Sequence, residues 1–522
     1  MTLNGLPPNK GIVIFSGGSA ANNLVDVFNA VRESKDCSLT YVIPISDNGG
    51  SSSELIRIFG GPGIGDVRSR LVRLIPDSPP GSERAAIKAI FNHRLSTDAS
   101  VAHDEWYSIV NGTSDLWKLV TPAKKELIRS FFNLLNMEIL KRARPPSSTF
   151  DFTSASVGNL FLTAARLFSG SFESAIYLLS SICGVPSDLV RVIPAINSNF
   201  SHHIAASLED GTIIVGQNSI SHPSEATALQ PKPGSRRPSL LLADSEEIDD
   251  SQPSDSSDAT TYEEDHLPGS LRSLRDKNIC YSKTENEELR SRISRVWYIN
   301  PYGQEIRPPA NPRVIDALRD SQAIIYSIGS LYTSIIPSLV LRGVGQDIVL
   351  SPARHKILIL NGSLDRETGP ACKPFTAVDF VEAIVRAGEE SRGWRSDRFP
   401  RKPFSSVRSI EQEKERDSPL SLPYNSYVTH VLHLDGPGTP KVDRERLTQM
   451  GIETVRLYGR AITVTDGERE VPIGMRYDSI GLIQALEVVL GKKGDGMLRG
   501  PGNGMSRSRR NTTEHAGRKE GR

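Results

Sequence analysis

Three glycine-marked loops lie between residues 11 and 75, each beside an apolar run. The first, SGGSAA, begins at Ser16 after a run that reads as a buried strand, and a helical pattern starts at Asn22. A strand, a glycine turn and a helix N-terminus make an anion site, because free backbone N–H groups and the helix dipole point at one spot. Gly17 and Gly18 would let a phosphate approach without a Cβ in the way. The loop lacks the G-x-G-x-x-G spacing and the P-loop lysine, so a plain structural turn remains the alternative.

The second loop, SDNGGSSS, follows another apolar run. Asp47 stands where a doubly wound sheet places ligands, at the carboxyl end of a strand, and its carboxylate suits a ribose hydroxyl, a metal ion or a proton. Gly49 and Gly50 again open the backbone. The serines at 51–53 are predicted to cap a helix that begins near Glu54.

The third loop reads GGPGIGDVRSR, with Asp66 as the predicted N-cap of a helix that carries Arg68 and Arg70. An arginine near a helix N-terminus is badly placed for the helix dipole, and pairing with a phosphate would offset that cost. For either arginine taken alone, the simpler interpretation is a position on a solvated helix face.

Together with later segments, these loops resemble the family of 2-phospho-L-lactate transferases and the related gluconeogenesis factors, a CofD-like superfamily with a Rossmann-like core. The matching segments follow one another in family order, and several such motifs are more specific than any one glycine loop. They are SGGS at 16–19, SDNGGSSS at 46–53, GIGDVR at 63–68, SVGNLFLTAARLF at 156–168, GQNSIS at 216–221, IGSLYTSIIPSL at 328–339 and ILNGSLDRET ending at 368.

The chain also departs from the family pattern. Many relatives carry paired aspartates in the second loop, whereas here Asp47 is followed by Asn48. An amide oxygen can still bind a hard cation but brings less charge, which puts magnesium binding in question. In the first loop, Ser19 and two alanines replace a Gly-Thr-Gly stretch.

Successive strand–loop–helix patterns favour a parallel sheet with right-handed crossovers, and they gather their loops at one edge. The expected fold is therefore α/β, with a Rossmann-like, doubly wound, mostly parallel sheet. An Asp210–Gly211 turn predicts a hairpin within this core. The expected parts are a first half of the core at 8–221 with a helical insertion at 104–143 packed on the sheet, an acidic Ser-rich disordered insert at 222–290, a second half at 291–490 with a flexible polar insert at 388–420, and a disordered basic tail at 491–522.

In its transferase branch, the resemblance implies that a phosphorylated three-carbon acid moves from a guanosine diphosphate carrier to a deazaflavin hydroxyl, with release of GMP and usually with Mg²⁺. Carried onto this sequence, the catalytic residues would be Asp47, Asp66 and Arg68, with Asp47 also binding the metal. The residues expected to bind the nucleotide or its phosphates are Ser16, Gly17, Gly18, Ser19, Asn22, Asn48, Gly49, Gly50, Ser51, Ser52, Gly65, Asn159, Asn218, Gly329, Ser330, Thr333 and Ser334. The alternative is a non-catalytic sensor of nucleotide sugars like the gluconeogenesis factors, so the ligand would be GDP-linked or UDP-linked.

The amino-acid composition is compatible with this interpretation but would not indicate it without the motifs. The 522 residues carry a net charge of +1, which gives no long-range field to attract nucleic acid or an acidic membrane. No signal-peptide pattern and no apolar run of roughly 20 residues occurs, so we expect a soluble, cytoplasmic protein. The expected partner is a small-molecule nucleotide, without specific nucleic acid or membrane, and a homodimer is left open. The histidines, His202 and His203 among them, are expected in structural or surface positions.

Overall fold

The computed structural model describes residues 9–18, 20–46, 49, 51–145, 149–221, 288–393, 423–466 and 469–491. The predicted acidic insert up to residue 287, most of the polar insert and the basic tail after residue 491 lie outside these residues. The predicted end of the acidic insert at 290 is wrong, because Leu289 is buried in the core. The predicted start of the polar insert at 388 is wrong, because a helix continues to Arg392.

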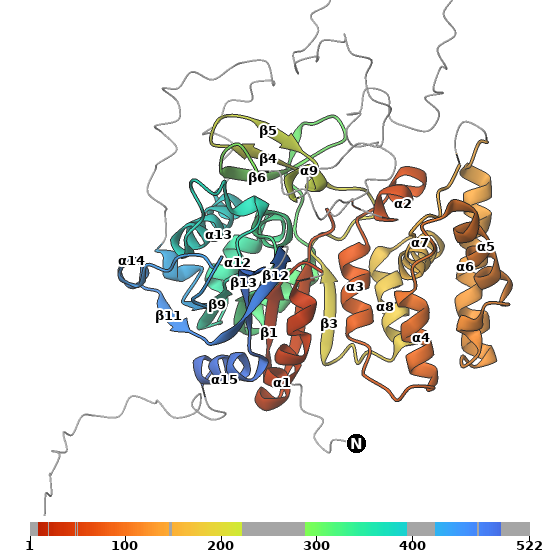
Figure 1. Cartoon of the computed structure of the whole chain (residues 1–522), viewed down its shortest axis with the longest axis horizontal. Helices are drawn as coiled ribbons and strands as arrows, with labels where there is room; N and C mark the ends of the chain where they lie inside the picture. Colours follow the sequence, from red (N-terminus) through yellow and green to blue (C-terminus); the bar gives the residue numbers. More distant parts are fainter. Residues whose placement is uncertain are drawn as a thin grey trace, which may run out of the picture.

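Among the described residues, seven strands form one parallel sheet in the order β11-β10-β9-β8-β1-β2-β3 (Figure 1). The inner strands are mostly apolar because both faces of a parallel sheet are buried, and every residue of β2 is buried, Ser38 and Thr40 included. This order confirms the α/β, doubly wound prediction. The strands are β1 (Asn9–Phe15), β2 (Cys37–Ile43), β3 (Val190–Pro194), β8 (Ser321–Tyr326), β9 (His355–Ile359), β10 (His430–His433) and β11 (Glu453–Arg456).

The helices mostly form crossovers between neighbouring strands, as α1 does between β1 and β2. At the end of the described chain, α15 packs against α1 (Figure 1). The helices outside the β2–β3 crossover are α1 (Val25–Lys35), α9 (Gln217–Ser221), α10 (Pro312–Arg319), α11 (Ile336–Leu339), α12 (Val344–Leu350), α13 (Ala377–Arg392), α14 (Arg444–Gln449) and α15 (Ser479–Val489). Short 3₁₀ turns are η1 (Ala21–Leu24), η2 (Asp115–Trp117), η5 (Arg366–Thr368) and η8 (Tyr424–Ser426), and η4 (Leu331–Ile335) is one turn of π-helix.

The crossover from β2 to β3 is a block of helices. Its members are α2 (Ser51–Phe59), α3 (Gly65–Arg73), α4 (Glu83–Asn92), α5 (Ala99–Asn111), α6 (Pro122–Arg142), α7 (Val157–Ser169) and α8 (Phe172–Cys183). The predicted helical insertion corresponds to α5 and α6, and Trp106 and Phe132 from these helices are fully buried. We expected the insertion to pack on the sheet, but α5 packs on α6 and α6 packs on α7, at the outer end of the block (Figure 1).

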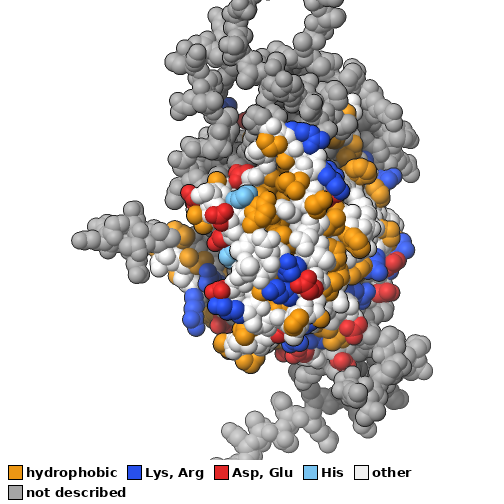
Figure 2. All heavy atoms as spheres, turned by 90° about the vertical axis from the view of Figure 1, so that its right-hand side faces the viewer, with side chains coloured by type: hydrophobic (Ala, Val, Ile, Leu, Met, Phe, Trp, Pro, Cys, Tyr) orange, Lys and Arg blue, Asp and Glu red, His pale blue; other side chains and the backbone are white. Residues whose placement is uncertain are grey.

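The outer face of this block carries exposed apolar side chains. Figure 2 looks onto that side of the molecule and shows apolar side chains gathered among scattered charges. On α6, Met137 and Leu140 are more than half exposed, and Phe168 at the end of α7 is exposed while its ring packs edge-on against Phe131.

A second, antiparallel sheet lies above the carboxyl ends of the parallel strands (Figure 1). It comprises β4 (His203–Leu208), β5 (Ile213–Val215), β6 (Ile293–Ile299) and β7 (Glu305–Ile306), in the order β5-β4-β6-β7. The predicted hairpin is confirmed, with Gly211 at φ 87° in its turn. Its second strand was expected at 212–217 but spans only Ile213–Val215, because residues 217–221 form α9.

The last described region contains a two-stranded antiparallel ribbon, β12 (Gly459–Asp466) and β13 (Arg469–Tyr477), which the sequence did not predict. No helix in the described ranges is long and apolar enough to cross a membrane.

Candidate functional site

The strand order reverses between β1 and β8, and the predicted loops meet at this point. In a doubly wound sheet such a reversal opens a crevice at the carboxyl ends of the two strands, where ligands bind. The first loop leaves β1 at Ser16 and the GSLYTS loop leaves β8 at Ser327, whose N–H donates to the carbonyl of Phe15 at 3.0 Å. After these loops, the chain leads from β1 to β2 on one side of the reversal and from β8 to β9 on the other side.

Gly17 and Gly18 are required for close packing between these loops. A Cβ on Gly17 would clash with the hydroxyl of Ser334 and lie 2.8 Å from its Cβ. A Cβ on Gly18 would clash with the carboxylate of Asp66 and lie 2.9 Å from its Cγ. Side chains from the third loop and the GSLYTS loop therefore reach the first loop.

The third loop enters α3 differently from the prediction. Helix α3 begins at Gly65 with Ile64 as its N-cap residue, so the prediction of Asp66 as N-cap is wrong. Asp66 lies in the first helical turn, where the helix dipole favours its negative charge. That position brings its carboxylate against the backbone of Gly18.

Arg70 supports the first loop from inside the protein. Its side chain is fully buried, and its guanidinium donates to the carbonyls of Gly17 at 3.0 Å and Ala21 at 3.3 Å. A longer bond of 3.4 Å reaches Ser16 Oγ, and the group lies 4.4 Å from the ring centre of Tyr41. Burial lowers the pKa of Arg70. The interpretation of a solvated arginine is wrong for this residue.

Arg68 is buried as well, so that interpretation is wrong here too. Its Nε donates to Oδ1 of Asn159 on α7 at 3.1 Å. Gly158 permits this contact, because a Cβ there would lie 2.8 Å from Cδ of Arg68. The two arginines of α3 thus hold two predicted site segments, the first loop and the start of α7.

The GSLYTS loop is hydrogen-bonded to side chains from the segment that follows β9. Gly329, at φ 138°, exchanges two 2.9 Å hydrogen bonds with the side chain of Asn361, which follows β9. Ser330 is the N-cap residue of η4. The backbone N–H groups of Tyr332 and Thr333 donate to Oε2 of Glu367 at 2.8 and 3.1 Å, and Thr333 Oγ1 donates to Oε1 at 2.5 Å.

Glu367 therefore occupies the place where an anion would bind at the N-terminus of η4. Its side chain is buried beside that of Asp365, and burial raises the pKa of Glu367 to about 8. Burial raises the pKa of Asp365 in the same way. Sequence reasoning noted the segment that ends at Thr368 but missed the role of Glu367 and Asn361. The signal available was their position after β9, at the same sheet edge as the glycine loops.

Of the second loop, the structure describes the flanking residues and Gly49. Ser46 Oγ donates to Oε1 of Gln217 on α9 at 3.1 Å, which connects the end of β2 to the small-sheet side of the crevice. Helix α2 begins at Ser51, so the serines form its first turn and the predicted helix start near Glu54 is wrong. Ser52 is buried, and its N–H donates to the carbonyl of Gly49 at 3.1 Å.

Four predicted site residues lie outside the described residues. These are Ser19, Asp47, Asn48 and Gly50. Within the described ranges, no group of three or more His, Cys, Asp or Glu side chains could hold a metal ion.

Two further predicted amides lie in η1 and α9. Nδ2 of Asn22 donates to Ser69 Oγ of α3 at 2.7 Å, and its buried Oδ1 has no partner among the described residues. Asn218 is buried in α9. Helix α9 is joined to η5 because Arg366 Nε donates to the carbonyl of Ile220 at 3.3 Å.

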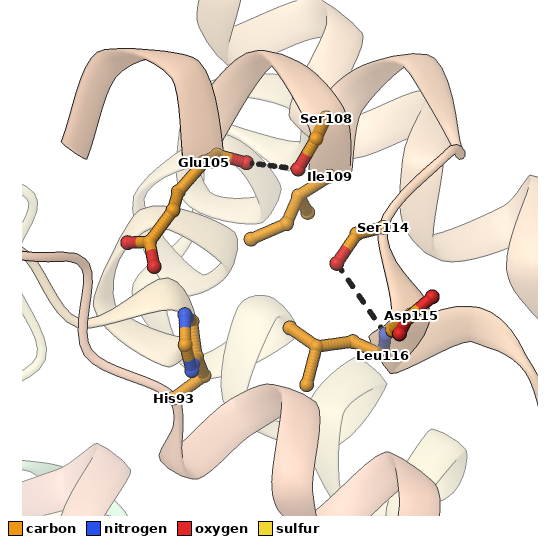
Figure 3. Close-up of a pocket in the computed structure, with 7 residues that line it drawn as sticks. All are labelled: His93, Glu105, Ser108, Ile109, Ser114, Asp115 and Leu116. Carbon is orange, nitrogen blue, oxygen red and sulfur yellow. Dashed lines mark hydrogen bonds between the residues drawn. The ribbon is translucent and has the colours of Figure 1, made fainter. Parts of the chain in front are cut away.

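A separate cavity of 250 Å³ lies in the helical block, not in the crevice (Figure 3). His93 and Glu105 line one side of it, and Ser114, Asp115 and Leu116 line the other. One oxygen of the Glu105 carboxylate accepts a hydrogen bond from the N–H of Ser96 at 2.8 Å. None of the predicted site residues lines this cavity, so we do not assign the candidate site to it.

Comparison with known proteins identifies relatives along most of the chain. The family model described as 2-phospho-L-lactate transferase CofD matches residues 12–456. The Saccharomyces cerevisiae protein YNL011C is 41% identical over 361 residues, which is 68% of this chain and 79% of that protein. The gluconeogenesis factor of Bacillus subtilis is 23% identical over 373 residues, 72% of this chain and 73% of that protein.

The fold resembles that of a solved structure, protein BH3568 from Bacillus halodurans. The TM-score is 0.50 at 19% sequence identity, with 92% of this chain and 100% of that chain covered. A second structure of the same protein is described as a member of the UPF0052 family and matches with the same TM-score.

Proposed function

This chain belongs to the 2-phospho-L-lactate transferase CofD family, and from that membership we propose that it binds a nucleoside diphosphate carrier in the crevice between β1 and β8. The proposed reaction transfers a phosphorylated acid from the carrier to a hydroxyl group of an acceptor. The observation that supports it most is the meeting of the first loop, Asp66 and Ser334 at the reversal of strand order.

The chemistry needs positioning and charge stabilisation more than a covalent intermediate. The acceptor oxygen attacks the phosphorus atom that carries the acid, a new O–P bond forms, and the bond to the nucleoside monophosphate breaks. The monophosphate leaves with the electron pair, and the proton of the acceptor hydroxyl passes to a base. We assign this base to Asp47, which lies outside the described residues.

Two arginines can influence this chemistry from beneath the crevice. Arg70 holds the carbonyls of the first loop and Arg68 holds Asn159, so each fixes a segment expected to contact the nucleotide. Their positive charges also lie on the side where the phosphates would bind, and burial strengthens their field. Mg²⁺, held by Asp47 and Asn48, would neutralise charge on the diphosphate when bound.

A second function is favoured by one residue of this chain. Asn48 stands where many relatives carry an acid, and a protein that only binds its ligand can dispense with that charge. The alternative proposal is a non-catalytic regulator that binds a nucleotide sugar, like the gluconeogenesis factors that the chain resembles.

Calorimetry with GDP, UDP, GDP-mannose and UDP-glucose, each with and without Mg²⁺, separates the two proposals. Guanosine preference that strengthens with Mg²⁺ supports the transferase, and a metal-independent preference for UDP-glucose supports the regulator. If no nucleotide binds, both proposals are wrong.

The transferase proposal also predicts the effect of Asp47→Ala. This variant should lose turnover and keep the melting temperature of the parent. Asp77→Ala is the control, because the Asp77 side chain is almost fully exposed. Turnover retained by Asp47→Ala would refute the role of Asp47 as base.

A further inference from the structure

His202 carries two unsatisfied ring nitrogens inside the protein. Neither Nδ1 nor Nε2 has a hydrogen-bond partner in the described part of the chain, although both atoms are buried. A neutral imidazole has one donor and one acceptor, and leaving either unmade in the interior costs about 1–3 kcal/mol. Native proteins keep such exceptions where a ligand or water completes the bonds.

Tyr298 of β6 lies against this imidazole. The two rings meet edge to face, with centres 6.1 Å apart and planes at 88°. Tyr298 is 1% exposed, and its hydroxyl lacks a hydrogen bond of standard geometry among the described residues. Ser46, at the end of β2, is close enough to lower the pKa of this phenol, which burial raises.

The register of the small sheet directs Tyr298 toward the crevice side. Tyr298 pairs with Ile204, and both belong to the core shared with the parallel sheet. Their strand neighbours Trp297 and Ala205 pack in a separate cluster on the other face. His203 pairs with Ile299, so it shares that other face although it adjoins His202.

The surroundings of His202 fit an uncharged ligand group. Burial lowers the pKa of His202 to about 4, and burial is the only cause of that shift, so the ring is neutral at pH 7. A neutral imidazole, a phenol and a serine hydroxyl offer both donors and acceptors without a charge. This set matches hydroxyl groups of a sugar or polyol better than a phosphate or carboxylate.

We propose that His202, Tyr298 and Ser46 form a subsite for the hydroxyl-bearing part of the ligand, a sugar or polyol group, beneath the small sheet. The subsite rests on the proposed nucleotide-binding function and adds where the uncharged part of the ligand binds. Ser46 connects this subsite to the proposed nucleotide site, because Ser46 begins the second loop. Its hydroxyl donates a hydrogen bond to Gln217.

The test compares nucleotides with and without a sugar on the full-length protein. Calorimetry measures UDP against UDP-glucose and GDP against GDP-mannose, for the parent and for His202→Leu. We expect the variant to bind the sugar nucleotide at least tenfold more weakly and to bind the bare nucleotide as the parent does. His202→Gln should recover part of the loss, because its amide keeps a donor and an acceptor. His203→Gln is the matched control and should change neither affinity.

The melting temperature of His202→Leu gives a second readout that needs no ligand. Leucine removes the unsatisfied nitrogens, so the variant should melt at or above the temperature of the parent. A lower melting temperature would show that the imidazole is bonded within the free protein and would overturn the proposal.

The outcomes separate the two proposals. If the parent binds bare nucleotides but the sugar adds no affinity, or if His202→Leu weakens both ligands equally, the subsite is refuted and nucleotide binding stands. If the parent binds no nucleotide, the proposed function is refuted and the subsite with it.

Discussion

Replacing Arg70 by methionine should lower the free energy of unfolding by about 3 kcal/mol. Methionine keeps an apolar stem of similar length but donates no hydrogen bond. The carbonyls of Gly17 and Ala21 would lose their donor in a fully buried position, at about 2 kcal/mol each, and the contact with the Tyr41 ring contributes about 2 kcal/mol more. Removing a buried charge returns about 3 kcal/mol of desolvation cost.

Urea unfolding followed by circular dichroism measures this loss. Arg73→Met is the matched control in the same helix, because Arg73 pairs with the largely exposed Asp26 and should lose no more than about 1 kcal/mol. Arg70→Lys should lie between the two, since an ammonium group keeps the charge but cannot reach both carbonyls and the ring.

The same variants test whether Arg70 positions the first loop. On the proposed function, Arg70→Met should weaken binding of GDP or UDP at temperatures where the protein is still folded, and Arg73→Met should not. The reasoning is refuted if Arg70→Met and Arg73→Met unfold at the same urea concentration with the same slope.

Two further changes test the loops of the crevice. Gly18→Ala should destabilise the protein by about 1–3 kcal/mol and weaken nucleotide binding, because its Cβ would strike the carboxylate of Asp66. Gly481→Ala, which meets no atom closer than 3.6 Å, is the control in urea unfolding and calorimetry, and equal losses would contradict the steric argument. Glu367 has a folded pKa of about 8, above its unfolded value, so its stabilising contribution is full below pH 4.5 and is lost as the pH rises through 8. Glu367→Gln should therefore gain stability relative to the parent between pH 5 and pH 8.5 in urea unfolding, and a pH-independent difference would contradict the buried carboxyl group.

The position of the glycine loops was predictable because the backbone pattern is local. A buried apolar run followed by glycines and a helical pattern identifies one strand–loop–helix unit, and parallel strands bring all such loops to one edge. The first loop accordingly follows β1, which ends at Phe15, and the second loop follows β2, which ends at Ile43. The sequence resemblance then indicated which of these loops belong together.

The environment of the arginines was not predictable, because their partners are distant and are not side chains of opposite charge. Arg70 bonds to backbone carbonyls 49 and 53 residues earlier in the chain. Every residue has a backbone carbonyl, so no residue type in the sequence indicates which carbonyl will accept a bond from an arginine. A buried arginine of α3 that bonds to carbonyls therefore has the same sequence pattern as an arginine on a solvated helix face.

The role of Glu367 was missed for a related reason. It accepts bonds from backbone N–H groups 34 and 35 residues earlier, and only the packing of β9 beside β8 brings them together. The shortened hairpin has a local cause, because Gly216 adopts φ 88° and turns the chain into α9 before the apolar pattern ends.

The two sides of the crevice are unequal, and this inequality bears on where a diphosphate would bind. On the β8 side, Glu367 already accepts the N–H groups at the start of η4, so an anion there would have to displace a buried carboxyl group. On the β1 side, Arg70 braces the loop carbonyls, and the carboxylate of Asp66, which lies against Gly18, acts electrostatically on Arg70. A positive charge beneath one loop and a carboxyl group behind the other orient an asymmetric ligand. On the proposed function, the phosphates therefore belong to the first loop and α3, and the uncharged part of the ligand belongs to the proposed subsite at His202, Tyr298 and Ser46.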